Sequence, residues 1–339
     1  MEQQQQQQQQ PSQSISIETI ALNETLSISI EEFSQLNQLK EALSASNIDY
    51  AFDKYDNVFM LKFLRKAKGN IKKAVSYITN YFAFVREYDV ENISTITFPN
   101  NDKIKLFYPH GLHKTTNEGL PVLIQTLGDL RIDDINKLLP DKLLDKYIIK
   151  MLERLEHEIF PKLSKYYNKY IHSVFCIVDL KGLTTSLMSR KVFDFVYKQL
   201  SIVENYYPGM LGGLYFVNSG FIFRAVWSAC KYFYKESTRK CIALLGFEYS
   251  DKLLIKVNED NLPKFLGGNC NCEPYGCIFS DEGPWKRLVN NNRNERGIDN
   301  INSNNESGHI MMSSNFKEET IDNLKGGLEN INNSSNNNN

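Results

Sequence analysis

Four short apolar runs between residues 120 and 246 limit the possible fold more than any other feature. They have the length of buried strands, and they are LPVLIQTL (120–127), SVFCIVDL (173–180), LYFVNS (214–219) and CIALLG (241–246). Strands that are apolar on both faces are typical of parallel sheets covered by helices. Segments with the apolar spacing of helices separate or follow these runs, at 140–159, 193–206, 221–235 and 251–257. The alternation predicts an α/β fold with a mostly parallel sheet.

The region before the first of these strands contains only helical patterns. Its apolar residues recur every three or four positions, as in Phe33, Leu36, Leu39 and Leu43, then Val58, Leu61 and Leu64, then Ile71, Val75, Ile78, Phe82 and Val85. Gly69 and Asn70 supply a helix stop followed by an N-cap. The chain therefore divides into a predicted helical subdomain over 28–95 and a sheet domain over 100–288.

Both ends of the chain have the composition of disordered segments. Residues 1–27 are rich in Gln and residues 289–339 in Asn and Ser, with few large apolar side chains to form a core. The net charge of −1 argues against nucleic acid as a partner. Neither a signal-type segment nor an apolar run of about 20 residues is visible, and the six cysteines are expected as reduced thiols. These features predict a cytoplasmic protein.

Catalytic and nucleotide-binding motifs are weak. Gly209, Gly212 and Gly213 follow a helix and precede a strand, the reverse of the order in a dinucleotide fingerprint, so they predict a tight turn. No Walker A pattern occurs. Ser219 lacks the glycines of a nucleophile elbow. Asp179 opens a DLKG turn, where a carboxylate usually accepts backbone amides. The chain is not expected to be an enzyme.

The segment CNCEPYGC provides three possible metal ligands, Cys270, Cys272 and Cys277. A structural zinc site needs four ligands, and the nearest further candidate along the chain is His309 in the Asn-rich end. The other histidines show no ligand spacing; they are His110, His113, His157 and His172. No metal site is therefore expected.

Two further stretches each allow two interpretations. Six basic residues without an acid between them (Lys62, Arg65, Lys66, Lys68, Lys72 and Lys73) could contact anionic lipid headgroups or form a solvated helix face. The helix FIFRAVWSACKYFYK (221–235) is apolar on nearly all sides, so it is either buried or in contact with lipid. Trp227 and Tyr232 suit a water–lipid boundary, although periodicity alone favours a core helix.

Several motifs resemble those of the CRAL-TRIO lipid-binding family in their sequences and in their order along the chain. They are FLRKAKGNIKKAVSYITNYFAFVREY, HKTTNEGLPVLIQTLG, IVDLKGL, YYPGMLGGLYFVNSGFIF, STRKCIALLG, NLPKFLGGNC and SDEGPW, the last similar to the phosphatidylinositol/phosphatidylcholine-transfer branch. The resemblance implies an N-terminal helical region and a sheet that floors a lipid pocket. It also implies a mobile gate helix, which would contain Phe221, Phe223, Val226, Trp227 and Phe233.

The resemblance is weakest at the positions that contact the lipid. Where phosphatidylinositol-binding members carry a Glu-Arg pair after Tyr-Tyr-Pro, this chain has Gly209 and Met210. Ala67 stands at a headgroup-contacting Arg position, whereas Lys240 matches the phosphate-contacting Lys and Ser237 a nearby hydroxyl. The Tyr, Ser and Thr positions that the resemblance implies for phosphatidylcholine are occupied here by Leu112, Leu152, Val174, Cys176 and Val203. Such a lining favours an apolar ligand, because a buried phosphodiester must be paired and hydrogen-bonded.

The resemblance predicts a monomeric lipid-transfer protein with no cofactor beyond the bound lipid and with transient membrane contact. It would exchange one phospholipid of the phosphatidylinositol or phosphatidylcholine type. Alternatives are a carrier of a sterol or other neutral ligand, including a retinoid or tocopherol, and a lipid sensor or scaffold without transfer. A lipid hydrolase of the α/β type is a weaker rival, because His309 is the only histidine after Ser219.

Overall fold

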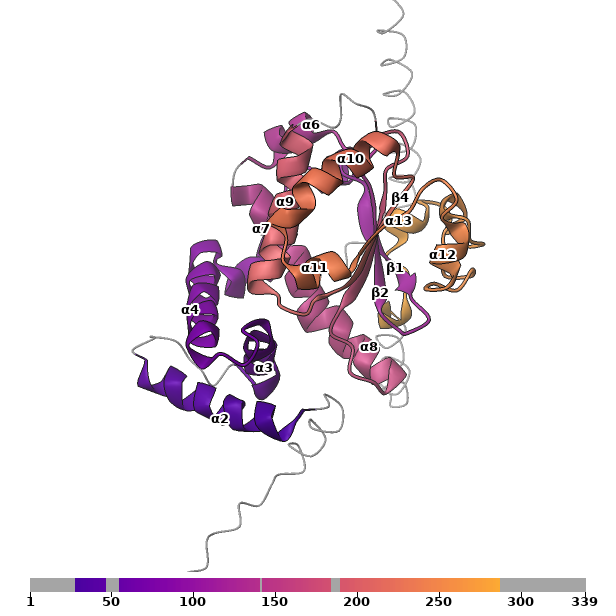
Figure 1. Cartoon of the computed structure of the whole chain (residues 1–339). Helices are drawn as coiled ribbons and strands as arrows, with labels where there is room; N and C mark the ends of the chain where they lie inside the picture. Colours follow the sequence, from indigo (N-terminus) through magenta and orange to yellow (C-terminus); the bar gives the residue numbers. More distant parts are fainter. Residues whose placement is uncertain (1–27, 47–54, 141, 184–189, 287–339) are drawn as a thin grey trace, which may run out of the picture. The chain divides into compact units, whose positions relative to one another are not determined.

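A five-stranded sheet organises the chain from residue 110 to residue 244 (Figure 1). The computed structural model describes residues 28–46, 55–140, 142–183 and 190–286, so both predicted disordered ends lie outside the described residues. The strands occur in the order β1 (His110–Thr115), β2 (Pro121–Thr126), β3 (Val174–Asp179), β4 (Leu211–Val217) and β5 (Ile242–Leu244). β1 pairs antiparallel with β2, and all the other pairs are parallel. The predicted fold class is confirmed.

The apolar runs explain why β2 and β3 occupy the centre of the sheet. Every residue of these two strands is buried, as expected for strands covered by helices on both faces. Apolar composition did not predict β1, because HGLHKT carries two histidines and a lysine. Its position at the edge, opposite β2 with Leu112 facing Leu123, lets such a mixed sequence form a strand.

Three capped helices form the predicted N-terminal region: α2 (Ile30–Ala45), α3 (Asn57–Lys66) and α4 (Ile71–Tyr88). Ser29 and Glu32 form a reciprocal capping box at α2. At the start of α4, Asn70 accepts a hydrogen bond from the Lys73 amide, which confirms the predicted N-cap. A 3₁₀ turn, η2 (Val90–Thr95), follows.

The remaining helical elements alternate with the strands. They are α5 (Asn101–Phe107), α6 (Ile132–Leu138), α7 (Lys142–Arg154), the π-helical η3 (Leu155–Ile159), α8 (Phe160–Tyr167), α9 (Arg190–Tyr206), α10 (Phe221–Cys230), η4 (Lys231–Phe233), α11 (Glu236–Lys240), α12 (Ser250–Leu254), η5 (Lys264–Leu266) and α13 (Cys277–Ser280). The predicted helix over 140–159 therefore continues into α8, whereas the one over 221–235 is a shorter α10 followed by a 3₁₀ turn. No helix among the described ranges is long and apolar enough to cross a membrane.

The two faces of the sheet carry separate cores (Figure 1). Alternate strand residues point to opposite faces, so Leu123 and Cys176 belong to one core and Ile124 and Ile177 to the other. Helices α7, α9 and α10 lie on the first face, and α12 and α13 lie on the second. Any site on one face is therefore screened from the other face by the sheet.

Part of the basic stretch in α3 is used for packing within the protein. Lys62 forms an ion pair with Glu156, and Arg65 pairs with Glu32 at 2.7 Å. Lys66 donates to the carbonyl oxygen of Asn205 at 2.6 Å, and burial lowers the pKa of its ammonium group to about 8. These three side chains bind to other elements of the fold, so they do not form a fully solvated helix face.

Candidate functional site

An apolar cavity of about 70 Å³ lies between the sheet and helices α7 and α9. Its floor is formed by side chains on one face of β2, β3 and β4, namely Leu123, Gln125, Val174, Cys176, Val178, Leu211, Leu214 and Phe216. The helices contribute Ile148, Met151, Leu152, Val196, Gln199, Leu200 and Val203, and Leu127, Leu155 and Met210 complete the lining. The cavity thus lies where the resemblance places a lipid pocket.

The cavity shares lining residues with a second, smaller cavity. Typical ligand pockets measure several hundred Å³, so a lipid can enter only if a wall moves outward. The second cavity, of about 30 Å³, lies under α10 and is lined in part by Phe223 and Trp227. Phe216 borders both cavities. Outward movement of α10 would therefore open the smaller cavity and release the packing around Phe216.

Helix α10 packs against the sheet with one side only. Phe223 and Trp227 place their ring centroids 5.1 and 6.1 Å from that of Phe216. On the other side, Phe221 is 86% exposed and Ile222 is 48% exposed. The core-helix interpretation is therefore wrong for this segment. Val226 is half-buried, and the side chain of Phe233 lies outside the described residues.

The cavity is also lined by two polar side chains that were not predicted from the sequence, Gln125 and Gln199. The Tyr108 hydroxyl donates to Gln199 Oε1 at 3.0 Å, and Gln125 Nε2 donates to the same oxygen at 3.4 Å. Gln125 could have been found from the sequence, because it is the polar residue on the cavity face of a run that is otherwise apolar there. Gln199 could not, since its position depends on how α9 crosses the sheet.

His110 extends this polar group at the start of β1. Its Nδ1 lies 2.7 Å from the Tyr108 carbonyl oxygen, which can only accept, so Nδ1 carries the proton. The other nitrogen, Nε2, accepts from the Tyr147 hydroxyl at 3.3 Å. Burial lowers the pKa of His110 from 6.5 to about 4, with a smaller contribution from Lys105. The ring is therefore neutral at neutral pH.

This depressed pKa predicts a loss of stability on acidification. Below pH 6.5 His110 binds a proton in the unfolded chain, whereas in the folded protein it stays neutral down to about pH 4. The contribution of neutral His110 to the free energy of unfolding is therefore complete above pH 6.5 and is lost as the pH falls. The expected loss is on the order of 3 kcal/mol, and the His110→Gln variant should not show it. Urea unfolding between pH 4 and 7 measures the difference.

His157 provides the control for this experiment. Its pKa is raised by its hydrogen bond to Glu153, which is the opposite direction. The contribution of a raised pKa is already complete below pH 6.5, so His157→Gln should leave the decline in stability below that pH unchanged, whereas His110→Gln should make it shallower. Equal slopes for His110→Gln and the unmodified protein would contradict the prediction.

The structure brings together only part of the predicted lipid-contact set. Leu152, Val174, Cys176 and Val203 line the cavity. Leu112 is buried next to them, opposite Leu123 on the same face of the sheet. Gly209 lies in the turn after α9 with a φ of +82°, which favours glycine, and does not line the cavity.

The two polar members of the predicted set lie on the surface. Ser237 and Lys240 are exposed residues of the short helix α11. Lys240 Nζ forms an ion pair with Glu236 at 2.9 Å. Contact between Lys240 and a lipid phosphate would therefore require α11 or the headgroup to move.

The possible catalytic residues have structural hydrogen bonds. Asp179 accepts from the Lys181 amide at 2.8 Å and from Asn218 Nδ2 at 2.7 Å, the turn role expected from the sequence. Buried Ser219 donates to the Leu245 carbonyl oxygen and accepts from Arg224 Nε at 3.1 Å. Its hydroxyl therefore lacks the adjacent general base of a nucleophile elbow.

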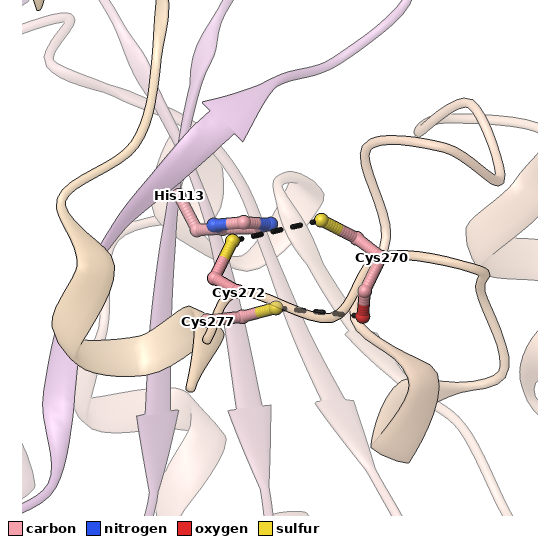
Figure 2. Close-up of side chains that lie close together, drawn as sticks. All are labelled: His113, Cys270, Cys272 and Cys277. Atoms are coloured by element: carbon pink, nitrogen blue, oxygen red, sulfur yellow. Dashed lines mark hydrogen bonds between the residues drawn. The ribbon is translucent and has the colours of Figure 1, made fainter. Parts of the chain in front are cut away.

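The fold supplies a fourth potential ligand to the cysteine segment. His113 of β1 lies beside Cys270, Cys272 and Cys277 (Figure 2). The expectation of no metal site assumed that a fourth ligand had to be found in the tail, and that premise does not hold. Spacing could not reveal His113, because a separate strand carries it to the cysteines.

Comparison with known proteins identifies the family. The model of the CRAL/TRIO domain matches residues 108–268. The Sec14 cytosolic factor of Schizosaccharomyces pombe is 31% identical over 235 residues, which is 69% of this chain and 81% of that protein. This chain belongs to the CRAL/TRIO family. The resemblance seen in the sequence is therefore confirmed.

Other relatives of this CRAL/TRIO chain are longer proteins. The phosphatidylinositol/phosphatidylcholine transfer protein SFH11 of Arabidopsis thaliana is 34% identical over 235 residues, or 68% of this chain and 62% of that protein. SFH12 of the same plant is 30% identical over 262 residues and is covered over 46% of its length. The crystal structure of Sfh5 shares the fold, with a TM-score of 0.52 at 15% identity over 79% of this chain and 98% of that one.

Proposed function

We propose that this CRAL/TRIO chain binds one phospholipid of the phosphatidylinositol or phosphatidylcholine type and exchanges it between membranes. The names of its plant relatives support this substrate class. The proposal includes a cytoplasmic monomer that contacts membranes transiently and catalyses no reaction. The observation that carries it is the pair of adjoining apolar cavities, the smaller of which lies under α10, a helix whose outer side exposes Phe221 and Ile222.

The energetics of apolar burial favour exchange over uptake. Removing a methylene from water contributes about 0.8 kcal/mol whether it enters a bilayer or an apolar cavity. Moving an acyl chain from membrane to protein is therefore close to neutral, provided that the chain never passes through water. A helix that inserts its exposed apolar side into the membrane while its inner side uncovers the cavity would meet that condition.

A neutral lipid such as a sterol is the second candidate. None of the described residues that line the cavity carries a charge at neutral pH, and Lys240 is exposed. Burying a phosphodiester without a charged partner costs several kcal/mol. Gln125 and Gln199 could instead hydrogen-bond a single hydroxyl group.

Mass spectrometry of lipids extracted from the protein, purified from its own cells, distinguishes these candidates. Phosphatidylinositol or phosphatidylcholine in an equimolar amount would support the main proposal. A sterol or other neutral lipid would support the second candidate. Absence of any lipid, together with no saturable lipid transfer between vesicles, would overturn both.

Replacing Phe221 with aspartate should slow transfer without affecting the fold. The side chain is 86% exposed, so the change removes no core packing, but the membrane-contacting side of α10 loses an apolar anchor and gains a charge. A loss of about 1.4 kcal/mol in membrane contact corresponds to an approximately tenfold slower rate of transfer between vesicles.

Ile255→Asp is the matched control, because Ile255 is 73% exposed and follows α12 on the opposite face of the sheet. It should transfer lipid at the unmodified rate. Equal rates for both variants would argue against α10 as the membrane-contacting element. A lipid sensor would bind lipid in both variants and transfer it in neither.

A further inference from the structure

Four side chains with metal-ligating atoms converge at the edge of the sheet (Figure 2). Cys270 and Cys272 come from the segment that leads into α13, Cys277 is the first residue of that helix, and His113 comes from β1. All four ligand atoms lie within 4.8 Å of one another, and the sulfurs of Cys270 and Cys272 are 3.7 Å apart. Tetrahedral zinc with Zn–S bonds of about 2.3 Å would place its sulfurs roughly 3.8 Å apart.

The hydrogen bonds of His113 leave one of its ring nitrogens available to a metal. Ser280 Oγ donates to the Cys277 carbonyl oxygen at 2.9 Å, so it is free to accept from His113 Nδ1, which is 3.2 Å away. The proton therefore lies on Nδ1, and Nε2 presents a lone pair. His113 is fully buried, and Nε2 has no hydrogen-bond partner among the described residues. A buried nitrogen without a partner is costly unless it binds something.

The same contact with Ser280 is the arrangement that metal-ligating histidines usually show. Their second nitrogen donates to a fixed oxygen, which sets the tautomer and the ring orientation. Three cysteine sulfurs with one imidazole form a soft ligand set that suits zinc and excludes magnesium and calcium. Four protein ligands fill a tetrahedral site, so the ion would be structural and would have no open position for a substrate.

We propose that His113, Cys270, Cys272 and Cys277 bind one structural zinc ion. Zinc binding releases the thiol protons of the cysteines to solvent and involves no change in redox state. The site is independent of the lipid cavity, because Leu112 belongs to the cavity-side core and the adjacent His113 turns to the other face of the sheet.

The ion would fasten the C-terminal segment to β1. Beyond the cysteines, the Lys114 amide donates to the Glu282 carbonyl oxygen, and Arg154 donates twice to Asp281, at 2.7 and 3.0 Å. Trp285 at the end of this segment is buried. Zinc bound by His113 on one side and by the cysteines on the other would add a further link between this segment and β1.

The test is elemental analysis of the full chain, produced with zinc in the medium and purified under reducing conditions without chelator. About one zinc per chain is expected, with removal by a strong chelator lowering the melting temperature. His113→Gln and Cys277→Ser should each lose most of the metal. His157→Gln and Cys241→Ser are the matched controls, since both residues lie outside the cluster, and they should keep it.

Cobalt substitution of the unmodified chain provides a readout that does not depend on folded variants. Tetrahedral thiolate coordination should give intense visible ligand-field bands together with a sulfur-to-cobalt charge-transfer band. A chain that binds neither zinc nor cobalt while all of its thiols remain reduced would overturn the proposal. So would a disulfide between two of the three cysteines in freshly isolated protein, detected by peptide mapping after alkylation. Neither result would affect the proposed lipid exchange.

Discussion

Replacing Cys176 with tryptophan should abolish lipid binding while leaving the protein folded. Cys176 lies in the middle of β3, and its side chain faces the cavity of about 70 Å³ between the sheet and α9. An indole there would occupy the space that a lipid must enter. Overpacking a core costs typically about 1–3 kcal/mol, less than the stability of an ordinary domain. Lipid recovered with the purified protein and vesicle transfer should both fall at least about tenfold.

Cys176→Val is the matched control, because it keeps the site apolar and changes its volume little. It should carry as much lipid as the unmodified chain. Circular dichroism and thermal unfolding would show that the tryptophan variant retains its fold. Normal lipid content in that folded variant would place the lipid elsewhere and remove the cavity from the proposal.

Replacing Gly111 with alanine should strongly destabilise the protein. A Cβ atom at this position of β1 would lie 1.9 Å from the carbonyl oxygen of Ile278 in α13, and backbone atoms cannot move aside as a flexible side chain can. Either α13 or the edge of the sheet must shift. We expect the free energy of unfolding to fall by at least about 3 kcal/mol, as measured by urea denaturation.

Gly220→Ala is the comparison for this change. A Cβ atom at Gly220 would have no atom within 4 Å, and the residue has an extended conformation that alanine adopts easily. Its stability should stay within about 1 kcal/mol of the unmodified protein. A Gly111→Ala variant as stable as Gly220→Ala would mean that α13 does not pack this closely on β1.

The two changes concern opposite faces of the sheet. Cys176 and Leu112 belong to the core on the cavity side, whereas Gly111 and His113 face α13 and the cysteine cluster. The sheet therefore positions the proposed lipid pocket on one face and the proposed zinc site on the other. A variant that loses lipid binding should therefore still bind zinc, and a variant that loses zinc should still bind lipid.

The local sequence by itself determined those helices and strands whose apolar residues follow a regular spacing. The runs around Leu123 and Cys176 are mostly apolar on both faces, which is typical of strands covered on both sides. The apolar spacing in α4 and the N-cap at Asn70 likewise depend on residues at most four positions apart. Four of the predicted lipid-contact residues, including Val174 and Val203, line the cavity because they lie in such elements, and their contact with lipid stays a prediction.

Only the tertiary structure decided which side chains meet across elements. Periodicity described α10 as apolar on nearly all sides, but the placement of Phe216 determines that Phe223 is covered and Phe221 is not. Lys240 matched a phosphate contact in sequence, yet α11 holds it at the surface. His113 showed no spacing relative to the cysteines, and the pairing of β1 with β2 and its packing against α13 bring it to them. Local spacing cannot encode these contacts, because strand pairing and helix packing create them between segments far apart in the chain.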